Sequence, residues 1–270
     1  MTPQYIGRLT LEAILEIKTG LHIGAGKDAI EIGGIDNPVV KHPHSREPYI
    51  PGSSVKGKAR FLLEWAFNTV RGEDGRAFGF NDDDADAERL ANGGDVILRL
   101  FGTAASRKKW EGGPTRLIVR DAPLNAEWKK QTLDEGHLFT EDKAEVSIDR
   151  IAGKALQGGL RHTERVVAGA RFDVEIGVRL WDTDDGGRRD REALAWLIQA
   201  LDLIEQDALG GSGSRGYGQV RFDNLRLVGH DGAKHNLDNV FRGHRFDPVT
   251  PPADILAQVE QAAQSLGKAA

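Results

Sequence analysis

Tyr49-Ile50-Pro51-Gly52-Ser53-Ser54-Val55-Lys56-Gly57-Lys58-Ala59-Arg60 ends an extended segment and begins a helix with three cations in its first turns. Ser53 or Ser54 is a natural N-cap residue, and the free backbone amides and dipole of a helix favour an anion at its N-terminus. Lys56 and Arg60 are four residues apart and therefore share one face of the helix. The stretch predicts a binding site for phosphate groups, although an ordinary capped helix with solvated charges would have the same pattern.

The patterns on both sides of this stretch predict an α+β chain. Alternation of apolar and polar residues is typical of half-buried strands, and spacings of three and four are typical of helices. The expected elements are strands at 9–17, 115–120, 172–180 and 217–228 and helices at about 53–70 and 189–208. Their order is that of a ferredoxin-like or RNA-recognition-motif fold. The residues expected on the buried helix faces are Val55, Ala59, Leu62, Ala66, Leu194, Leu197, Ile198, Leu201 and Ile204.

Long insertions modify this order. Residues 71–94 are polar and rich in Gly and Asp, which predicts a mobile surface loop or short lid within an insertion at about 71–114. Two extended pieces flank a Gly-containing tip at 152–159, so that about 140–166 is predicted to form a protruding hairpin with cations on both arms. We expect one domain over 1–229 and a C-terminal extension over 230–270 that ends in a short helix.

Composition narrows the class of protein. The chain has 270 residues, a net charge of −5 and a pI of about 5.9, so any binding to nucleic acid has to come from local groups of cations. It contains no cysteine, which excludes disulfides, thiolate zinc sites and a cysteine nucleophile. The N-terminus alternates like a strand, and no apolar run approaches the ~20 residues needed to cross a bilayer. We expect a cytoplasmic protein.

A glycine-rich run, Gly211-Ser212-Gly213-Ser214-Arg215-Gly216, matches the dinucleotide-binding fingerprint by letter only. That motif requires a strand before it and a helix after it, whereas here a helix precedes and a strand follows. The run from Gly210 to Gly218 instead suits a close approach to a polymer backbone, with amides that donate to phosphates and Tyr217 as a stacking face. A helix C-cap followed by a turn is the alternative.

Asp36 lies in the run from Ile32 to Val39, just before an Asn-Pro pair. An Asp in this position can form a turn, or it can present a carboxylate that binds a divalent ion or assists a hydroxyl group. Asp28 and Glu31 are close enough in sequence to contribute. His22 lies beside the same loop and can face either a substrate or the core.

Five motifs, taken in order, resemble the RAMP superfamily, and within it most closely the repeating backbone subunit of type III-A CRISPR effector complexes (Csm complexes). The motifs are Gly20-Leu21-His22-Ile23-Gly24, Ile35-Asp36-Asn37-Pro38-Val39, Ile50 to Lys58, Ser147-Ile148-Asp149-Arg150 and Gly210 to Gly218. The resemblance implies a modified ferredoxin-like fold and a subunit that polymerises along a CRISPR RNA. It implies that the hairpin is a thumb, which displaces a base of the paired guide and target at regular intervals.

By the same resemblance, Asp36 matches the catalytic aspartate of the family and would bind a divalent metal ion, Mg²⁺, for cleavage of target RNA. The implied partners are CRISPR RNA, target RNA, further copies of the chain and other subunits of the type III complex. The implied RNA-binding residues are His22, Ser53, Ser54, Lys56, Lys58, Arg60, Arg150, Arg161, Arg165, Gly211, Ser212, Gly213, Ser214, Arg215 and Tyr217.

Three alternatives remain open at the level of sequence. The chain could be a noncatalytic scaffold in which Asp36 is structural. It could be a stand-alone RAMP endoribonuclease that processes precursor CRISPR RNA, with His22 as the acid or base. A ferredoxin-like metabolic enzyme is the third alternative, and the lack of a convincing cofactor loop argues against it.

Overall fold

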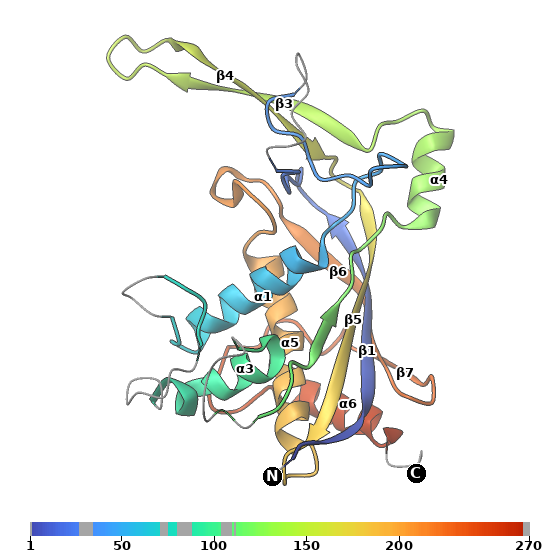
Figure 1. Ribbon diagram of the computed structural model, residues 1–270. Coiled ribbons are helices and arrows are strands. Elements are labelled where there is room, and N and C mark those ends of the chain that lie inside the picture. Colours follow the sequence, from blue (N-terminus) through green and yellow to red (C-terminus); the bar gives the residue numbers. More distant parts are fainter. Residues whose placement is uncertain are drawn as a thin grey trace.

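The body of the protein is a five-stranded antiparallel sheet with helices packed on one face (Figure 1). The computed structural model describes residues 2–26, 35–70, 75–79, 88–103, 110 and 112–266. The strands are β1 (Gln4–Ile17), β2 (Leu117–Val119), β5 (Arg171–Asp182), β6 (Val220–Val228) and β7 (Lys234–Asn236), in the spatial order β2-β5-β1-β6-β7. Strands β2, β5, β1 and β6 lie side by side in the ferredoxin-like order, which confirms the predicted fold. The strand predicted to be the last, β6, is followed in sequence by β7, which pairs with it and forms the edge of the sheet.

The two long strands β1 and β5 pair along their length, and each supplies alternate residues to the core. The register places Leu9 opposite Val178 and Leu11 opposite Ile176, and all four side chains are buried. Because side chains alternate across a strand, this register buries one apolar set of each strand against the helices.

Three helices, α1 (Gly52–Ala66), α5 (Arg188–Gln206) and α6 (Ala253–Ala263), pack on one face of the sheet, and α3 (Asp95–Phe101) packs on α5 and α1 (Figure 1). The five residues predicted for the buried stripe of α5 are all buried. In α1, Val55 and Ala59 are buried as predicted, but Leu63 completes the stripe, whereas Leu62 and Ala66 are only partly buried.

The 71–114 insertion contributes to the core. Residues 71–74 and 80–87 lie outside the described residues. In the described part, Phe78 is fully buried, and a short π-helix, η2 (Leu90–Gly94), leads into α3. The prediction of a mobile surface loop is therefore wrong for Phe78 and for η2, because an aromatic side chain anchors this part of the insertion.

A buried ionic group fixes α3 and β2 against α5. The Asp190 carboxylate accepts hydrogen bonds from Arg99 at 3.1 Å and from Arg116 at 2.8 Å, and both arginine side chains are at most 2% exposed. The backbone N–H of Trp181 donates to the same carboxylate at 2.8 Å. Each buried charge therefore has an opposite charge as partner, as buried ions require.

Residues 230–266 pack onto the body. Leu237, Phe241, Ile255 and Val259 are fully buried in the core. Arg242 donates to both carboxylate oxygens of Glu205 on α5, at 2.7 and 2.8 Å. In the described part of the chain, no helix is long and apolar enough to cross a membrane.

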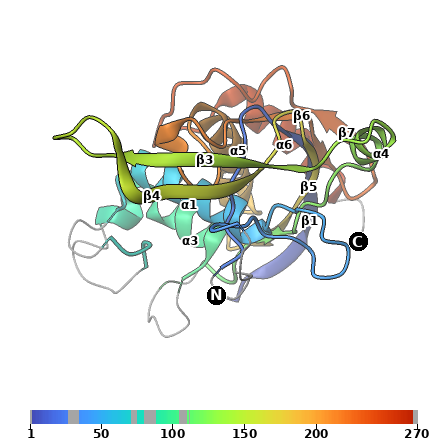
Figure 2. The ribbon, with the colours of Figure 1, turned by 90° about the horizontal axis from the view of Figure 1, so that it is seen from above.

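The predicted hairpin is present and forms a separate two-stranded sheet of β3 (Thr140–Ile148) and β4 (Ala155–Val166). It rises from the body beside α4 (Ala126–Asp134), and a view from above shows it crossing the body with its tip projecting beyond (Figure 2). Residues 149–154 form the tip, which is displaced from the predicted 152–159. Val146, Ile148, Ile151, Leu156 and Leu160 are exposed on this hairpin.

Candidate functional site

Asp36 lies in a segment, residues 35–41, that runs along the outer edge of β4. The N–H of Asn37 donates to the carbonyl of His162 at 3.2 Å, and the N–H of Glu164 donates to the carbonyl of Asn37 at 3.0 Å. The Asp36 Oδ2 atom accepts the backbone N–H of His162 at 2.8 Å. Asp36 is exposed, and its Oδ1 atom has no hydrogen-bond partner among the described residues. The hairpin, rather than a local turn, therefore holds the carboxylate with one oxygen open to solvent.

The buried side chain of Glu164 holds the segment of residues 35–41 against the hairpin. Its side chain is 5% exposed and accepts hydrogen bonds from the Lys41 ammonium, from Thr140 Oγ1 at 2.7 Å and from the Val39 N–H at 3.0 Å. Burial alone would raise the pKa of Glu164, but these hydrogen bonds and the Lys41 charge together lower it. A carboxylate that accepts three donors stays ionised and joins β3, β4 and the Asp36 segment.

His22 connects the base of the hairpin to the glycine-rich loop, residues 210–218. Its Nδ1 atom donates to the carbonyl of Glu164 at 2.8 Å, since a carbonyl can only accept. Its own carbonyl accepts the N–H of Gly211 at 2.9 Å. A Cβ atom on Gly210 would lie 2.4 Å from the same carbonyl, and φ at Gly210 is +76°, so this glycine is required by packing within the protein.

Tyr217 is not a stacking platform for bases, which corrects the prediction from sequence. Its ring is 1% exposed and lies between the Lys143 ammonium, 4.4 Å from the ring centroid, and the Arg165 guanidinium, 4.6 Å away. Its hydroxyl donates to Glu145 at 2.8 Å. Burial and the Glu145 carboxylate raise the pKa of Tyr217. The residue attaches the glycine-rich loop to both strands of the hairpin, and its burial leaves no ring surface for a base to stack on.

Neither Ser53 nor Ser54 caps α1, so the prediction of a serine N-cap is wrong. The N-cap residue is Pro51, whose own side chain forms no capping hydrogen bond. The N–H of Gly52 instead donates to the Asp121 carboxylate at 2.8 Å. The anion at the N-terminus of α1 is thus the protein's own Asp121 carboxylate. Ser53 is exposed and Ser54 is half-buried.

The three cations of α1 have different environments. Arg60 donates to Glu64 at 2.6 Å and to the carbonyl of Phe78, so its guanidinium serves the fold and the prediction that it binds RNA is disfavoured. Lys58 forms an ion pair with Asp207 at 2.8 Å. Lys56 has no ion pair among the described residues. Its pKa is lowered by burial and then by the positive charges of Arg60 and Arg179, so an anion bound here would be favourable.

The cations of the hairpin and of the glycine-rich loop differ in whether their charge is exposed or is paired within the protein. Arg150 is exposed at the tip, and the Arg161 side chain donates to Ser147 Oγ at 3.2 Å, its one hydrogen-bond partner among the described residues. Arg165 is 16% exposed, pairs with Glu141 at 2.5 Å and covers Tyr217. On the glycine-rich loop, Arg215 is 57% exposed and lies 3.6 Å from Glu145. Arg150, Arg161 and Arg215 are therefore accessible to a ligand, and Arg165 is mainly structural.

The two faces of the hairpin carry different groups. Because β3 and β4 alternate, Lys143, Glu145 and Arg165 face the glycine-rich loop, whereas Glu164 and His162 lie on the face that the Asp36 segment contacts. The hairpin thus separates the glycine-rich loop from the Asp36 carboxylate.

Among the described residues, no group of three His, Asp or Glu side chains could hold a metal ion. A Mg²⁺ ion usually needs only one or two carboxylates, because waters and substrate phosphates complete its octahedral shell. The exposed Asp36 with its open Oδ1 fits such a site. Asp28 and Glu31, which could contribute by sequence position, lie outside the described residues.

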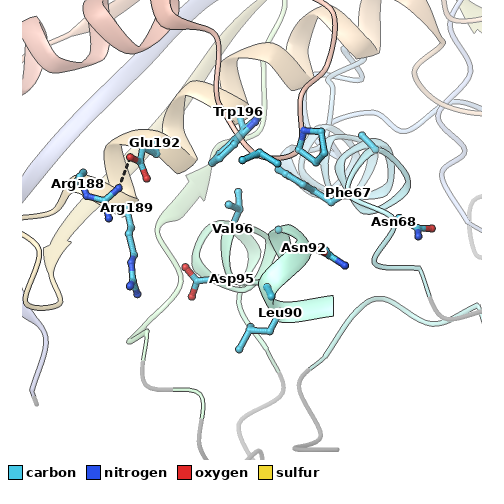
Figure 3. Close-up of a pocket in the computed structure, with 15 residues that line it drawn as sticks. Phe67, Asn68, Leu90, Asn92, Asp95, Val96, Arg188, Arg189, Glu192 and Trp196 are labelled. Carbon is cyan, nitrogen blue, oxygen red and sulfur yellow. Dashed lines mark hydrogen bonds and ion pairs between the residues drawn. The ribbon is translucent and has the colours of Figure 1, made fainter. Parts of the chain in front are cut away.

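A pocket of ≈ 410 Å³ lies elsewhere, between the end of α1, the start of α3 and the start of α5 (Figure 3). Phe67, Val96 and Trp196 line it, and Arg189 and Asp95 stand at its side. None of the residues predicted from sequence for the functional site lies in it. The hairpin surface and this pocket are therefore separate features.

A family model of the RAMP superfamily matches residues 14–221. The chain belongs to the RAMP superfamily. This RAMP protein is 38% identical over 242 residues to the CRISPR system Cms endoribonuclease Csm3 of Methanocaldococcus jannaschii, which covers 87% of this chain and 89% of the relative. It is 39% identical over 269 residues to the protein of the same name from Methanothermobacter thermautotrophicus, with 92% and 94% covered.

Two solved structures agree with this assignment. The RAMP chain aligns with a Csm3-Csm4 subcomplex of the type III-A CRISPR-Cas interference complex at a TM-score of 0.52 and 26% identity, covering 97% of this chain and 98% of the other. Methanopyrus kandleri Csm3 aligns at a TM-score of 0.53 and 26% identity, over 83% and 78% of the two chains. These likenesses and the curated relatives confirm the resemblance seen in the sequence.

Several residues of the site were not predicted from sequence: Glu164, Lys41, Glu145, Asp121 and Asp142, whose Oδ2 atom lies 2.6 Å from His162 Nδ1. Alternation along β3 and β4 gives the face on which a hairpin residue lies, but only the register shows that Asp142 lies opposite Glu164. Asp121 and Lys41 reach the site across 69 and 123 positions of sequence, and no local pattern signals contacts of that kind.

Proposed function

We propose that this protein is the repeating backbone subunit of a type III CRISPR ribonucleoprotein. In that complex it binds CRISPR RNA and cleaves complementary target RNA at regular intervals, with Asp36 as the catalytic carboxylate. The observation that carries the proposal is the position of Asp36, which is exposed and held at the edge of a projecting hairpin by the backbone N–H of His162. The names of the curated relatives, endoribonucleases of a CRISPR system, support the reaction.

The two faces of the hairpin suggest how the RNA strands are placed. The guide strand would lie on the side of the glycine-rich loop, where the backbone amides of residues 212–214 and the Arg215 guanidinium can donate to phosphates. The target strand would lie on the side of Asp36. Lys56, Arg150 and Arg161 add accessible positive charge. Base pairing between the two strands would supply the sequence specificity, because these contacts recognise only the RNA backbone.

A projecting hairpin also suits the chemistry. Cleavage of RNA by its own 2′-hydroxyl needs that oxygen in line with the scissile phosphate and the leaving 5′-oxygen, and a regular duplex holds these atoms out of line. Insertion of a hairpin that displaces one nucleotide would free the backbone to adopt the in-line geometry. The exposed apolar residues Val146 and Leu160 could then contact the displaced base.

Asp36 would hold Mg²⁺ through its open Oδ1 atom, with RNA and water as the remaining ligands. The ion, when bound, neutralises charge that develops on the phosphate. A single carboxylate has low affinity for Mg²⁺, so we expect weak binding of the ion to the isolated protein. Further copies of the chain and other subunits of the complex would bring the RNA to Asp36, and we expect cleavage only in the assembled complex.

The test uses a labelled target RNA and complexes assembled with wild-type, Asp36→Ala or Asp134→Ala protein, each with Mg²⁺ or with EDTA. Asp134 is exposed at the end of α4 and serves as the matched control. We expect evenly spaced cuts from wild type and Asp134→Ala with Mg²⁺, and binding without cuts from Asp36→Ala. Binding without cuts by wild type would support a noncatalytic scaffold. Cleavage of precursor CRISPR RNA by the isolated protein, lost in His22→Ala, would support the stand-alone enzyme instead.

A further inference from the structure

Beside Asp36 the hairpin carries a second polar pair, His162 and Asp142. The Nδ1 atom of His162 lies 2.6 Å from Asp142 Oδ2, and the two side chains are 42% and 44% exposed. They are diagonal neighbours across the strands, because Ala144 lies opposite His162. An exposed pair of this kind contributes only about 0 to 1 kcal/mol to stability. The fold therefore does not depend on it.

The partner of Nδ1 determines what the other ring nitrogen can do. A carboxylate only accepts hydrogen bonds, so in the neutral ring Nδ1 carries the proton and Nε2 has a lone pair. The Nε2 atom has no hydrogen-bond partner among the described residues. It is thus a fixed, accessible acceptor, which can pair with a hydroxyl group but not with the oxygens of a phosphate.

The residue that carries this acceptor contacts the proposed catalytic carboxylate. The backbone N–H of His162 donates to Asp36 Oδ2 at 2.8 Å across the outer edge of β4, whereas its imidazole turns toward Asp142 on β3. On an RNA backbone, the 2′-hydroxyl is the group that can donate a hydrogen bond, and it is also the nucleophile in the proposed cleavage.

We propose that His162 Nε2 accepts a hydrogen bond from the ribose 2′-hydroxyl next to the scissile phosphate and acts as the acceptor of its proton. The inference rests on the proposed function. As the 2′-oxygen bonds to phosphorus, its proton passes to Nε2 and the bond from phosphorus to the 5′-oxygen breaks. The 5′-oxygen takes a proton from solvent, the imidazolium returns one to solvent, and the products are a 2′,3′-cyclic phosphate and a 5′-hydroxyl. Asp142 is a positioning residue that fixes the tautomer and the angle of the ring.

The first experiment measures single-turnover cleavage by assembled complexes. His162→Asn keeps a side-chain donor near the place of Nδ1 and removes Nε2, and we expect a rate about 10² to 10³ times lower, as for loss of a general base. Asp142→Asn should lower the rate about tenfold, the effect of one hydrogen bond. Target binding should weaken by about 2- to 10-fold in His162→Asn, the range for the one hydrogen bond that is lost, and stay within about twofold in Asp142→Asn. The matched control is His137→Asn, since His137 is an exposed histidine paired with Glu135 at 3.3 Å and should leave the rate unchanged.

The second experiment tests the hydrogen bond itself. In an Asp36→Ala background, which keeps the target intact, the affinity for a short target with one 2′-deoxy ribose at the cleavage position is compared with that for the all-ribose target. The deoxy substitution should weaken binding by about 2- to 10-fold when His162 is present, the range for one hydrogen bond. It should have no effect when His162→Asn is also present, since the acceptor is then missing.

The outcomes separate this inference from the proposed function. If His162→Asn cuts at the wild-type rate while Asp36→Ala is inactive, the inference is overturned and the proposed function stands. If Asp36→Ala also cuts at the wild-type rate, the proposed function fails first. A loss of target binding in His162→Asn that equals its loss of cleavage, with the same 2′-deoxy effect in both backgrounds, would show a structural role and overturn the inference.

Discussion

Tyr217 should determine how firmly the hairpin is held to the body. Its buried ring lies between Lys143 on β3 and Arg165 on β4, and its hydroxyl donates to Glu145 on β3 at 2.8 Å. Two substitutions divide these contacts. Tyr217→Phe removes the hydroxyl and keeps the ring, whereas Tyr217→Ala removes both.

The magnitudes follow from the contacts. A hydrogen bond to a charged group contributes about 1.5 to 3 kcal/mol. The lower value applies here because the Glu145 side chain is 22% exposed and water can replace the hydroxyl. Removing a whole buried aromatic side chain costs about 3 to 5 kcal/mol, and this total already includes the two cation–π contacts of about 0.5 to 1 kcal/mol each. We therefore expect losses of about 1.5 kcal/mol for Tyr217→Phe and about 4 kcal/mol for Tyr217→Ala.

Amide hydrogen exchange of β3 and β4 measures this loss directly. Since 1.4 kcal/mol corresponds to a factor of ten, exchange should be about tenfold faster in Tyr217→Phe and about 10² to 10³ times faster in Tyr217→Ala. Tyr5→Ala is the control, because Tyr5 is 55% exposed on β1 and packs against Trp181 rather than the hairpin. Unchanged exchange of the hairpin in Tyr217→Ala would refute the reasoning.

The remaining predictions separate binding from stability. Lys56→Ala should reduce the slope of log affinity against log salt by about one unit for RNA binding and leave the melting temperature unchanged, whereas Arg60→Ala should lower the melting temperature and leave the slope unchanged; salt titrations and thermal denaturation check both. Asp190→Asn leaves the buried Arg116 guanidinium without a carboxylate partner, while Arg99 keeps Asp95, and should cost about 3 to 5 kcal/mol, or roughly 10 °C in melting temperature. Because the pKa of Glu164 is lowered from 4.5, its contribution to stability is complete above that value and is lost as pH falls through the lowered pKa, so urea unfolding of Glu164→Gln should lack this part of the acid dependence.

The order of strands and helices could be predicted because its signals are local. Alternation in β1 and β5 and the apolar stripe of α5 reflect the periods of strands and helices, which the burial of one face imposes on sequence. The hairpin was found in the same way. β7 was missed because three residues are too few to show a period.

The candidate site was predicted only in part. Asp36 and the glycine-rich loop were identified through motifs, and the structure places them on opposite sides of the hairpin. Tyr217 and Arg60 were interpreted as ligands of RNA because their side-chain types suit that role. Whether such a side chain faces a ligand or its own protein depends on partners that are far away in sequence, here Glu145 and Glu64.

The sequence by itself determined the family, the ferredoxin-like order of elements and the identity of Asp36 as a candidate, because these depend on local periodicity and on short motifs. Only the tertiary structure decided which charges are free. Lys56 and Arg60 share one helix face in sequence, yet Arg60 is neutralised by Glu64 and Lys56 has no ion pair among the described residues. The physical reason is that an ion pair depends on distances of a few ångströms between side chains, and the folded chain sets those distances through register and packing that no local pattern specifies.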